Sequence, residues 1–387
     1  MPHVNDDVVI VGIGETRVGK LPGMSSLHIQ AEAVLNAMAD AGCVLPDVDG
    51  VINLDPYAIP QSMFSSTLTE YLGLRPSFIS TVDVGGTVSA MTMLQQAVWA
   101  IRSGHCSLAV CVYGENTLTG RPAGVQGLMM RNLLGGEEWE EPFGVQGMVI
   151  PYALVAQRYL SQYGATEDDL GAVAVVTRRH ALLNANAQMK KQMTLVDHHA
   201  SRMISAPLRL LDCSLVSDGG GAVVLAARDR AARLPRRPVI IRSMAMRATH
   251  NSVAQLPDIE RFGMAEAARD AFESAGAGPR DMNLAALHDA FTISVLVTLE
   301  AMGFASPGGA GDYIRGGAAS LGGSCPVNTH GGLLSQAHIG GMLHITEAVR
   351  QLRGEAGVRQ VPDARLAVVS GNGGVFSVCG AMVLERG

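Results

Sequence analysis

Two histidines stand in segments whose residue types suit acid–base chemistry. His288 lies in LHDAFT (287–292), and His338 lies in the glycine-rich stretch NTHGGLLSQAHIGG (328–341), which leads into an amphipathic helical segment. Backbone N–H groups at a helix start favour anions, and the same field lowers the pKa of a nearby imidazole and keeps it neutral. The sequence therefore predicts a neutral base at His338 and makes His288 a second catalytic candidate. The alternatives are a histidine that packs on its own helix at 338 and a buried, hydrogen-bonded one at 288.

A third segment could hold a developing negative charge. The strand-like run that begins at Val368 ends in Gly371, Asn372, Gly373 and Gly374, which leaves several backbone amides bare. Such N–H groups can donate to an oxyanion. We therefore predict an anion site at Gly374 and a substrate contact at Asn372, although a plain glycine turn explains the same residues.

A glycine pair precedes a second predicted helix start. In TVDVGGTVSAM (81–91), Gly86 and Thr87 stand directly ahead of a long helical segment. Glycine at such a point allows the backbone to come close to a small ligand. We predict further substrate contacts at strand or loop ends near the same cleft, at Asp83, Gly86, Tyr113 and Asn328.

The elements that must position these residues are alternating strands and helices. Buried strand-like runs such as DVVIVGIG and SLAVCVYGEN alternate with helical stretches such as SSLHIQAEAVLNAMADAG. This alternation predicts an α/β fold with layered helices and sheet. Between about residues 118 and 210, clusters of glycine, methionine and acidic residues interrupt the pattern and predict an inserted loop subdomain.

A faint internal repeat relates the two ends of the chain. AVWAIRSG followed by SLAVCVYGEN resembles AVRQLRG followed by RLAVVSGNGG, with an offset of 251 residues. The same offset places Thr87 on His338. Two halves related by a pseudo-twofold axis would therefore bring both residues to matching helix starts that face one cleft.

Composition excludes several classes of protein. The chain has 387 residues and a formal charge of −6, so it has no basic surplus for nucleic acid. No apolar run approaches the roughly 18–20 residues that span a bilayer, and the N-terminus lacks a secretory signal, so we expect a cytoplasmic protein. The six cysteines form no CxxC pair, and we predict no metal site.

Nearly the whole chain resembles the thiolase superfamily, in the branch of sterol-carrier-protein-type thiolases and their lipid-transfer-protein relatives. The landmarks, in order, are VVIVGIGETRVGKLPG, AIRSG, LDCSLVSDGGGAVVL, LHDAF, NTHGGLLSQAHIGG and GNGG. The resemblance implies a five-layered α-β-α-β-α sandwich of two pseudo-twofold-related halves, 1–235 and 236–387, usually forming a homodimer. Members of the family act on acyl-CoA thioesters, so CoA arrives with the substrate and the chain needs no cofactor of its own.

The resemblance also marks what is missing. The nucleophilic cysteine of the family corresponds to Thr87, and its second cysteine would fall within residues 371–373, which are Gly-Asn-Gly. His288 and His338 remain at the positions of the HDxF and GHP histidines, with Ile339 in place of the proline. Thiolysis and Claisen condensation pass an acyl group through the cysteine, whereas a retro-aldol cleavage needs no such carrier.

The leading hypothesis is therefore an aldol-type C–C lyase. It resembles the cysteine-less thiolase-like aldolases that act on steroid side-chain CoA thioesters together with a small OB-fold and zinc-ribbon subunit of the DUF35 type. His338 and His288 would supply acid–base and oxyanion roles, and the N–H groups of Thr87 and Gly374 would complete the anion sites. Two alternatives remain, which are acyl transfer through an atypical nucleophile and a non-catalytic acyl-CoA-binding subunit. The candidate nucleophiles are Cys379, Cys325 and Thr87.

Overall fold

Nine strands form one mixed sheet in the part of the chain that the structure describes. The structure is a computed structural model that describes residues 7–120, 140–145, 147–256, 258 and 262–387. The strands follow the order β3-β2-β4-β7-β1-β8-β11-β10-β9. Their bounds are β1 Val8–Glu15, β2 Gly50–Asn53, β3 Phe78–Thr81, β4 Leu108–Asn116, β7 Asp218–Ala227, β8 Val239–Ala248, β9 Leu284–Ala286, β10 Leu366–Gly373 and β11 Val378–Arg386.

The sheet is built twice on the same plan. β1 is antiparallel to β7, β7 is antiparallel to β4, and β4 is parallel to β2. The second half repeats this series, because β8 is antiparallel to β11, β11 is antiparallel to β10, and β10 is parallel to β9. A short antiparallel ladder between β1 and β8 joins the halves. The two predicted halves are therefore confirmed, whereas the boundary between residues 235 and 236 stays a prediction.

Each strand sends alternate side chains to opposite faces of the sheet, as its pleat requires. In β4, Leu108 and Val110 face the core beneath helix α1 (Ser26–Ala41), whereas Ala109 and Cys111 face the central core of the molecule. The apolar runs seen in the sequence are thus strands that are buried on both faces.

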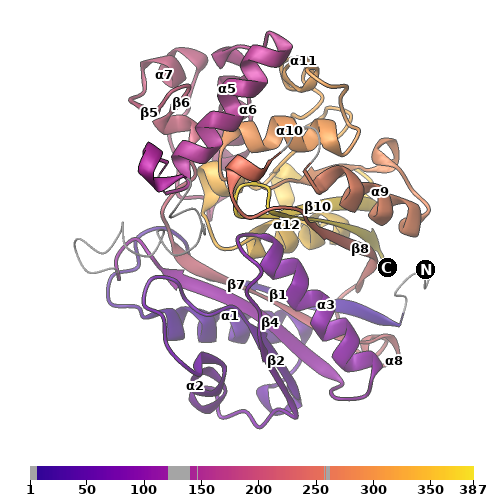
Figure 1. The fold of residues 1–387 in the computed structure, drawn as a ribbon. Coiled ribbons are helices and arrows are strands. Elements are labelled where there is room, and N and C mark those ends of the chain that lie inside the picture. The colour runs from indigo at the N-terminus through magenta and orange to yellow at the C-terminus, as the bar shows by residue number, and fades with distance from the viewer. Residues whose placement is uncertain (1–6, 121–139, 146, 257, 259–261) are drawn as a thin grey trace.

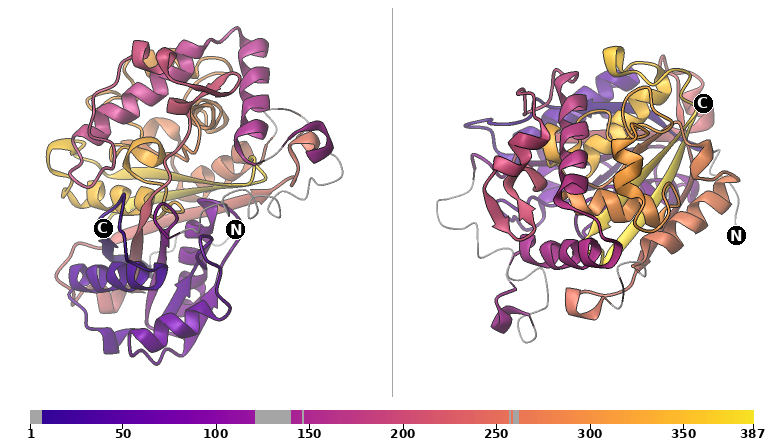
Figure 2. Two further views of the ribbon diagram at one scale, coloured as in Figure 1. Left: turned by 90° about the vertical axis from the view of Figure 1, so that its left-hand side faces the viewer. Right: turned by 90° about the horizontal axis from the view of Figure 1, so that it is seen from above.

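Helices on three levels complete the layers (Figures 1 and 2). α3 (Val88–Arg102) and α12 (Met342–Arg353) share one core with strands of both halves and form the central layer. α1 and α2 (Phe64–Tyr71) cover the outer face of the first half. α9 (Met264–Ala275) and α10 (Thr292–Ala301) pack on the outer face of the second half. The predicted five-layered α-β-α-β-α sandwich is confirmed.

An insertion between β4 and β7 packs on the second half of the molecule, at the top of Figure 1. The loop subdomain predicted at about 118–210 is mostly helical in its described part, and residues 121–139 lie outside the described residues. Tyr152, Tyr159 and Leu170 belong to the same core as α9 and α10. The remaining elements are α5 Val149–Tyr163, α6 Glu167–Leu182, α7 Leu195–Ala200, β5 Met203–Ser205, β6 Leu208–Arg209, α8 Arg228–Ala231 and α11 Ala310–Arg315.

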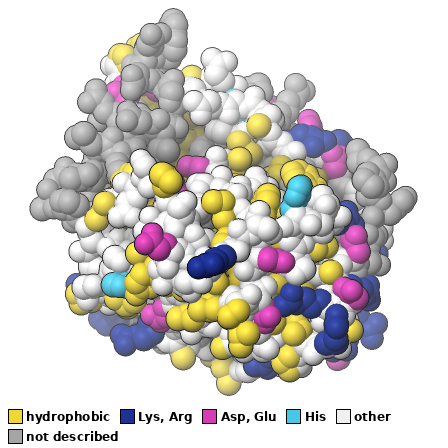
Figure 3. Space-filling view, turned by 90° about the horizontal axis from the view of Figure 1, so that it is seen from below, with side chains coloured by type: hydrophobic (Ala, Val, Ile, Leu, Met, Phe, Trp, Pro, Cys, Tyr) yellow, Lys and Arg dark blue, Asp and Glu magenta, His cyan; other side chains and the backbone are white. Residues whose placement is uncertain are grey.

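The surface carries charges of both signs. Figure 3 shows acidic, basic and apolar side chains interspersed on the face seen from below, without a field of one sign. Within the described ranges, no helix is long and apolar enough to cross a membrane.

Candidate active site

The N-termini of the two central helices meet at the centre of the molecule. Thr87 is the N-cap residue of α3, and Gly341 is the N-cap residue of α12 with a φ of 84°. A Cβ atom on Gly341 would lie 2.8 Å from the Cβ of Thr87 and 2.7 Å from its carbonyl oxygen, so only glycine allows this approach. The helix starts predicted from the repeat are therefore neighbours, and His338 lies in the loop just ahead of α12.

The Thr87 hydroxyl lies between the two halves of the molecule. Its Oγ1 is 2.8 Å from His288 Nδ1 and accepts a hydrogen bond of 2.9 Å from the N–H of Asn372. The Thr87 N–H in turn donates to the carbonyl oxygen of Asn372 at 2.9 Å. This bond occupies the amide that the sequence analysis assigned to an anion. The side chain of Thr87 therefore lies in the site, but its N–H is not a free donor.

His288 is buried directly after the short strand β9. Its side chain is fixed at Nδ1 by Thr87, and its backbone N–H donates to Ser370 Oγ at 2.9 Å. The other ring nitrogen, Nε2, is buried and has no hydrogen-bond partner among the described residues. Burial lowers the pKa of His288 well below its usual value, and the neighbouring His338 and His344 lower it further. His288 is thus neutral and keeps one nitrogen available for a ligand.

His338 is held in the same manner by a different hydroxyl. Its Nδ1 lies 3.1 Å from Ser214 Oγ, and its backbone N–H donates to Ser217 Oγ at 3.2 Å. Burial lowers the pKa of His338 to about 4, and the carboxylate of Asp289 acts in the opposite direction. At neutral pH His338 is therefore a neutral imidazole, and if its Nδ1–H donates to Ser214 Oγ, the unprotonated Nε2 can act as a general base.

The β10–β11 turn closes the site from the second half. Gly86 has a φ of 47°, and a Cβ there would lie 2.2 Å from the carbonyl oxygen of Asn372, so the glycine pair brings the two loops together. The side-chain amide of Asn372 donates to the hydroxyl of Tyr152 at 2.8 Å, and this hydroxyl donates to the carbonyl oxygen of Gly374 at 2.9 Å. The predicted residues Gly86, Asn372 and Gly374 are thus brought together around Thr87, with the Asn372 side chain engaged in the turn.

Asp83 and Tyr113 belong to a neighbouring polar cluster. The hydroxyl of Tyr113 donates to Glu115 Oε1 at 2.9 Å, and the hydroxyl of Tyr57 donates to Asp83 Oδ1 at 2.8 Å. A Cβ on Gly340 would lie 2.6 Å from the Tyr113 ring, which places this ring against the loop that follows His338. Neither residue has a described hydrogen bond with either site histidine.

Asn328 holds the backbone of the residue that precedes His288. Its side-chain Oδ1 accepts from the N–H of Leu287 at 2.7 Å, and its Nδ2 donates to the Leu287 carbonyl oxygen at 2.9 Å. Asn328 also has a positive φ of 51°. Both polar ends of its side chain are therefore used to fix the residue before His288, and the predicted substrate contact stays a prediction.

Three residues that were not predicted as site residues complete the arrangement. Ser214 fixes His338, Tyr152 fixes the turn at Gly374, and the carboxylate of Asp289 accepts from the loop ahead of His338. Asp289 could have been found from its place next to His288. Ser214 and Tyr152 carry no local signal, because each acts on a partner more than a hundred residues away.

Of the two candidate thiols, Cys379 borders this arrangement, because its Sγ lies 3.9 Å from Asn372 Oδ1. Cys379 and Cys325 are buried, and burial raises the pKa of Cys325 to about 12 and that of Cys379 further. The Cys379 thiol lies 3.4 Å from the carbonyl oxygen of Phe376 and has no described hydrogen bond with a histidine. Neither sulfur has the thiolate character that a nucleophile needs. Among the described residues, no group of three or more His, Cys, Asp or Glu is placed to hold a metal ion.

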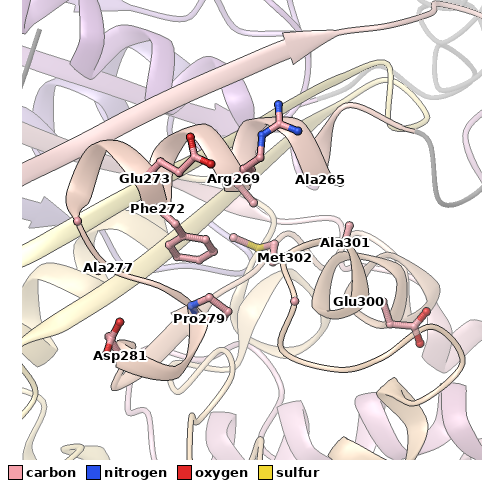
Figure 4. A pocket seen from close by; sticks show the side chains of 13 residues that line it. Ala265, Arg269, Phe272, Glu273, Ala277, Pro279, Asp281, Glu300, Ala301 and Met302 are labelled. Carbon is pink, nitrogen blue, oxygen red and sulfur yellow. The ribbon is translucent and has the colours of Figure 1, made fainter. Parts of the chain in front are cut away.

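An open groove of about 580 Å³ lies elsewhere, between α9 and the end of α10 (Figure 4). Phe272 and Met302 point toward one another in it, with the charged side chains of Arg269, Glu273 and Asp281 around them. None of the site residues described above lines this groove.

Comparisons with known proteins show the family of the chain. Residues 245–386 match the family model described as thiolase C-terminal domain-like. The chain is 37% identical to a steroid side-chain-cleaving aldolase of Thermomonospora curvata, over 95% of each chain. It is 35% identical to a 17-hydroxy-3-oxo-4-pregnene-20-carboxyl-CoA lyase of Mycobacterium tuberculosis, over 96% of this chain and 98% of the relative. The solved structure of an Ltp2-ChsH2(DUF35) aldolase aligns with a TM-score of 0.87 and 34% identity, over 98% of each chain.

These relatives extend over nearly the full length of the chain. The chain belongs to the thiolase superfamily, among its sterol-carrier-protein-type, aldolase-like members.

Proposed function

We propose that the chain is a lyase that cleaves the Cα–Cβ bond of a β-hydroxyacyl-CoA thioester by a retro-aldol reaction. One observation carries this proposal. The position of the family's nucleophile holds the Thr87 hydroxyl, which is engaged with His288 Nδ1 and the N–H of Asn372 rather than free to attack. The site therefore keeps two neutral imidazoles and loses the group that would carry an acyl chain.

His338 suits the role of base. Because its pKa lies near 4, it is neutral at pH 7, and the nearby carboxylate of Asp289 stabilises the imidazolium that forms when it accepts a proton. His338 takes the proton of the substrate β-hydroxyl, and the oxygen left behind forms a ketone or aldehyde as the Cα–Cβ bond breaks. The electron pair of that bond moves into the thioester and gives an enolate. The same proton then passes to Cα, which returns His338 to its neutral state.

His288 suits the role of oxyanion donor. If the Thr87 hydroxyl donates to Nδ1, the ring proton resides on Nε2, the nitrogen without a partner. This Nε2–H and the N–H of Gly374 would then hold the enolate oxygen. Removal of one such donor in other enzymes lowers kcat by about 10²–10³-fold. The buried Thr87 thus acts as a positioning residue that sets the tautomer of His288.

The names of the relatives point to a class of substrate and to a partner subunit. Two full-length relatives are named as a steroid side-chain-cleaving aldolase and a pregnene-carboxyl-CoA lyase, and the aligned structure is an aldolase with a DUF35 component. We propose that this chain likewise cleaves a steroid side-chain CoA thioester together with a DUF35-type subunit. It would need no cofactor besides the CoA of its substrate. Its six free cysteines fit a reducing compartment such as the cytoplasm.

We further propose that the chain forms a homodimer through the edge of the sheet. Among the described residues, β3 pairs with β2 alone and its other edge is open. Ile79 on this strand is 48% exposed, and Trp99 on the adjacent α3 is 57% exposed. An open edge with exposed apolar side chains favours pairing with a second chain.

The decisive experiment supplies the chain, co-expressed with its DUF35 subunit, with a steroid β-hydroxyacyl-CoA. Release of a ketone together with a shortened acyl-CoA is expected, without mass added to the protein. His338→Ala should abolish cleavage. His199→Ala, at a partly exposed histidine of α7 that pairs with Asp168, should leave cleavage unchanged.

Two other outcomes would replace the proposal. An acyl adduct on Thr87, Cys325 or Cys379, detected by intact mass, would identify an acyltransferase. Tight CoA-ester binding without turnover, unaffected by His338→Ala, would identify a binding subunit.

A further inference from the structure

Asp289 is completely buried, and the mechanism above gives it no contact with the substrate. Its carboxylate accepts hydrogen bonds from two backbone N–H groups, those of Leu333 at 2.8 Å and Leu334 at 3.4 Å. Both belong to a single turn of π-helix, Gly332–Gln336, that ends just before His338. The loop that carries His338 is thus hydrogen-bonded to Asp289, the residue that follows His288.

The turn is shaped around the carboxylate. Gly332 has a φ of 56°, and a Cβ atom at this position would lie 1.9 Å from Asp289 Oδ2. Only glycine permits this approach, and the backbone of the turn therefore lies directly against the acid. A π-helical turn is an uncommon conformation that is often found at functional sites.

His344 completes the support from α12. Its Nε2 lies 2.9 Å from the carbonyl oxygen of Leu287 and 3.2 Å from Asp289 Oδ1. Both neighbours are acceptors, so Nε2 must carry a proton. His344 thereby binds the residues on either side of His288, and one buried unit supports both site histidines.

We propose that Asp289, held by His344, is a positioning residue that fixes His338 relative to His288. The proposal rests on the proposed function, because it assigns Asp289 to the spacing of the two groups that carry the reaction. The carboxylate also favours the protonated form of His338, which the proposed cycle passes through. Among the described residues, the other titratable groups that act on His338 and His288 are His344 and these two histidines themselves.

The test is Asp289→Asn, which keeps the size of the side chain but removes its charge and one of its acceptor positions. A small misplacement of a reacting group can cost about 100-fold in rate, so we expect kcat to fall by about 10- to 100-fold with little change in KM. Glu347→Gln is the matched control. Glu347, on α12, is also almost fully buried, but its carboxylate pairs with Arg359 and not with a group near His288 or His338. We expect it to keep the kcat of the parent chain.

A second pair of variants serves if Asp289→Asn does not fold. His344→Gln retains an N–H near the position of Nε2 and should keep most activity, whereas His344→Leu should lose kcat as Asp289→Asn does. Equal activity of the two His344 variants would overturn the proposal. So would a folded Asp289→Asn variant with the kcat of the parent chain.

Nitrogen-15 NMR of the histidine rings separates this proposal from the proposed function. Asp289→Asn should shift the ring signals of His338 and lower the pH at which it titrates, whereas Glu347→Gln should do neither. This result is independent of whether the parent chain cleaves any thioester. A His338 signal unchanged by Asp289→Asn would refute the positioning role even in an active lyase.

Discussion

Replacement of Thr87 by valine tests whether the hydroxyl orients His288. Valine has the same branched shape, so the change leaves no cavity but removes the contact of 2.8 Å to His288 Nδ1 and the hydrogen bond of 2.9 Å from the N–H of Asn372. Both partners are buried. A buried polar group left without a partner costs about 1–3 kcal/mol, so two such groups lower the free energy of unfolding by about 2–6 kcal/mol.

The effect on activity should be larger than the effect on binding. Without the Thr87 hydroxyl, His288 loses the contact that selects its tautomer, and we expect kcat to fall by about 10²–10³-fold, as for an oxyanion donor. The KM for the acyl-CoA should change little. The assay is chromatography of the shortened acyl-CoA, with thermal unfolding followed by circular dichroism. Thr87→Ser keeps the hydroxyl and should retain most of the rate. A folded valine variant that turns over as fast as the serine variant would refute the reasoning.

Three further predictions concern pH, the insertion and the edge of the sheet. Burial lowers the pKa of His338 from 6.5 to about 4, so its contribution to the free energy of unfolding is fully present above pH 6.5 and is lost as the pH falls toward 4. Urea unfolding across this pH range should show the loss. A flatter pH profile in His338→Gln would show that His338 causes it. Tyr152→Phe removes the hydroxyl that bridges Asn372 and Gly374, and steady-state kinetics should show a loss of kcat of up to about tenfold; an unchanged rate would contradict its support of the turn. Ile79→Lys at the open edge of β3 should convert a dimer into a monomer in light scattering, and a monomeric parent chain would exclude the edge contact.

The layered arrangement of helices and sheet could be predicted from the sequence, and so could the proximity of Thr87, His288 and His338, whose roles stay a prediction. The landmark segments have characteristic types and spacing, and the glycines beside Thr87 and Asn372 mark places where the chain must pass closely. The halves of the molecule repeat one order of strands, which the 251-residue offset between Thr87 and His338 anticipated. These features are local or repeated, and both kinds can be recognised in a single sequence.

The state of the polar groups could not be predicted. The Thr87 N–H was assigned to an anion, but it is used by the carbonyl of Asn372, which is 285 residues away in the chain. Ser214 and Tyr152 likewise act only through tertiary contacts. Whether two groups form a hydrogen bond depends on differences of a few tenths of an ångström in the distance between donor and acceptor. The spacing of residues along the chain does not determine this distance.

The meeting of α3 and α12 at Gly341 has a consequence for how this fold changes its chemistry. Two helices direct the positive ends of their peptide dipoles at one point, and the backbone rather than any side chain supplies that field. The hydroxyl of Thr87 stands where the family has a cysteine sulfur, and this replacement leaves the electrostatic environment unchanged. A lineage can therefore move from breaking a carbon–carbon bond through an acyl-enzyme to breaking one without it by altering single side chains, while the scaffold keeps the same field at the site.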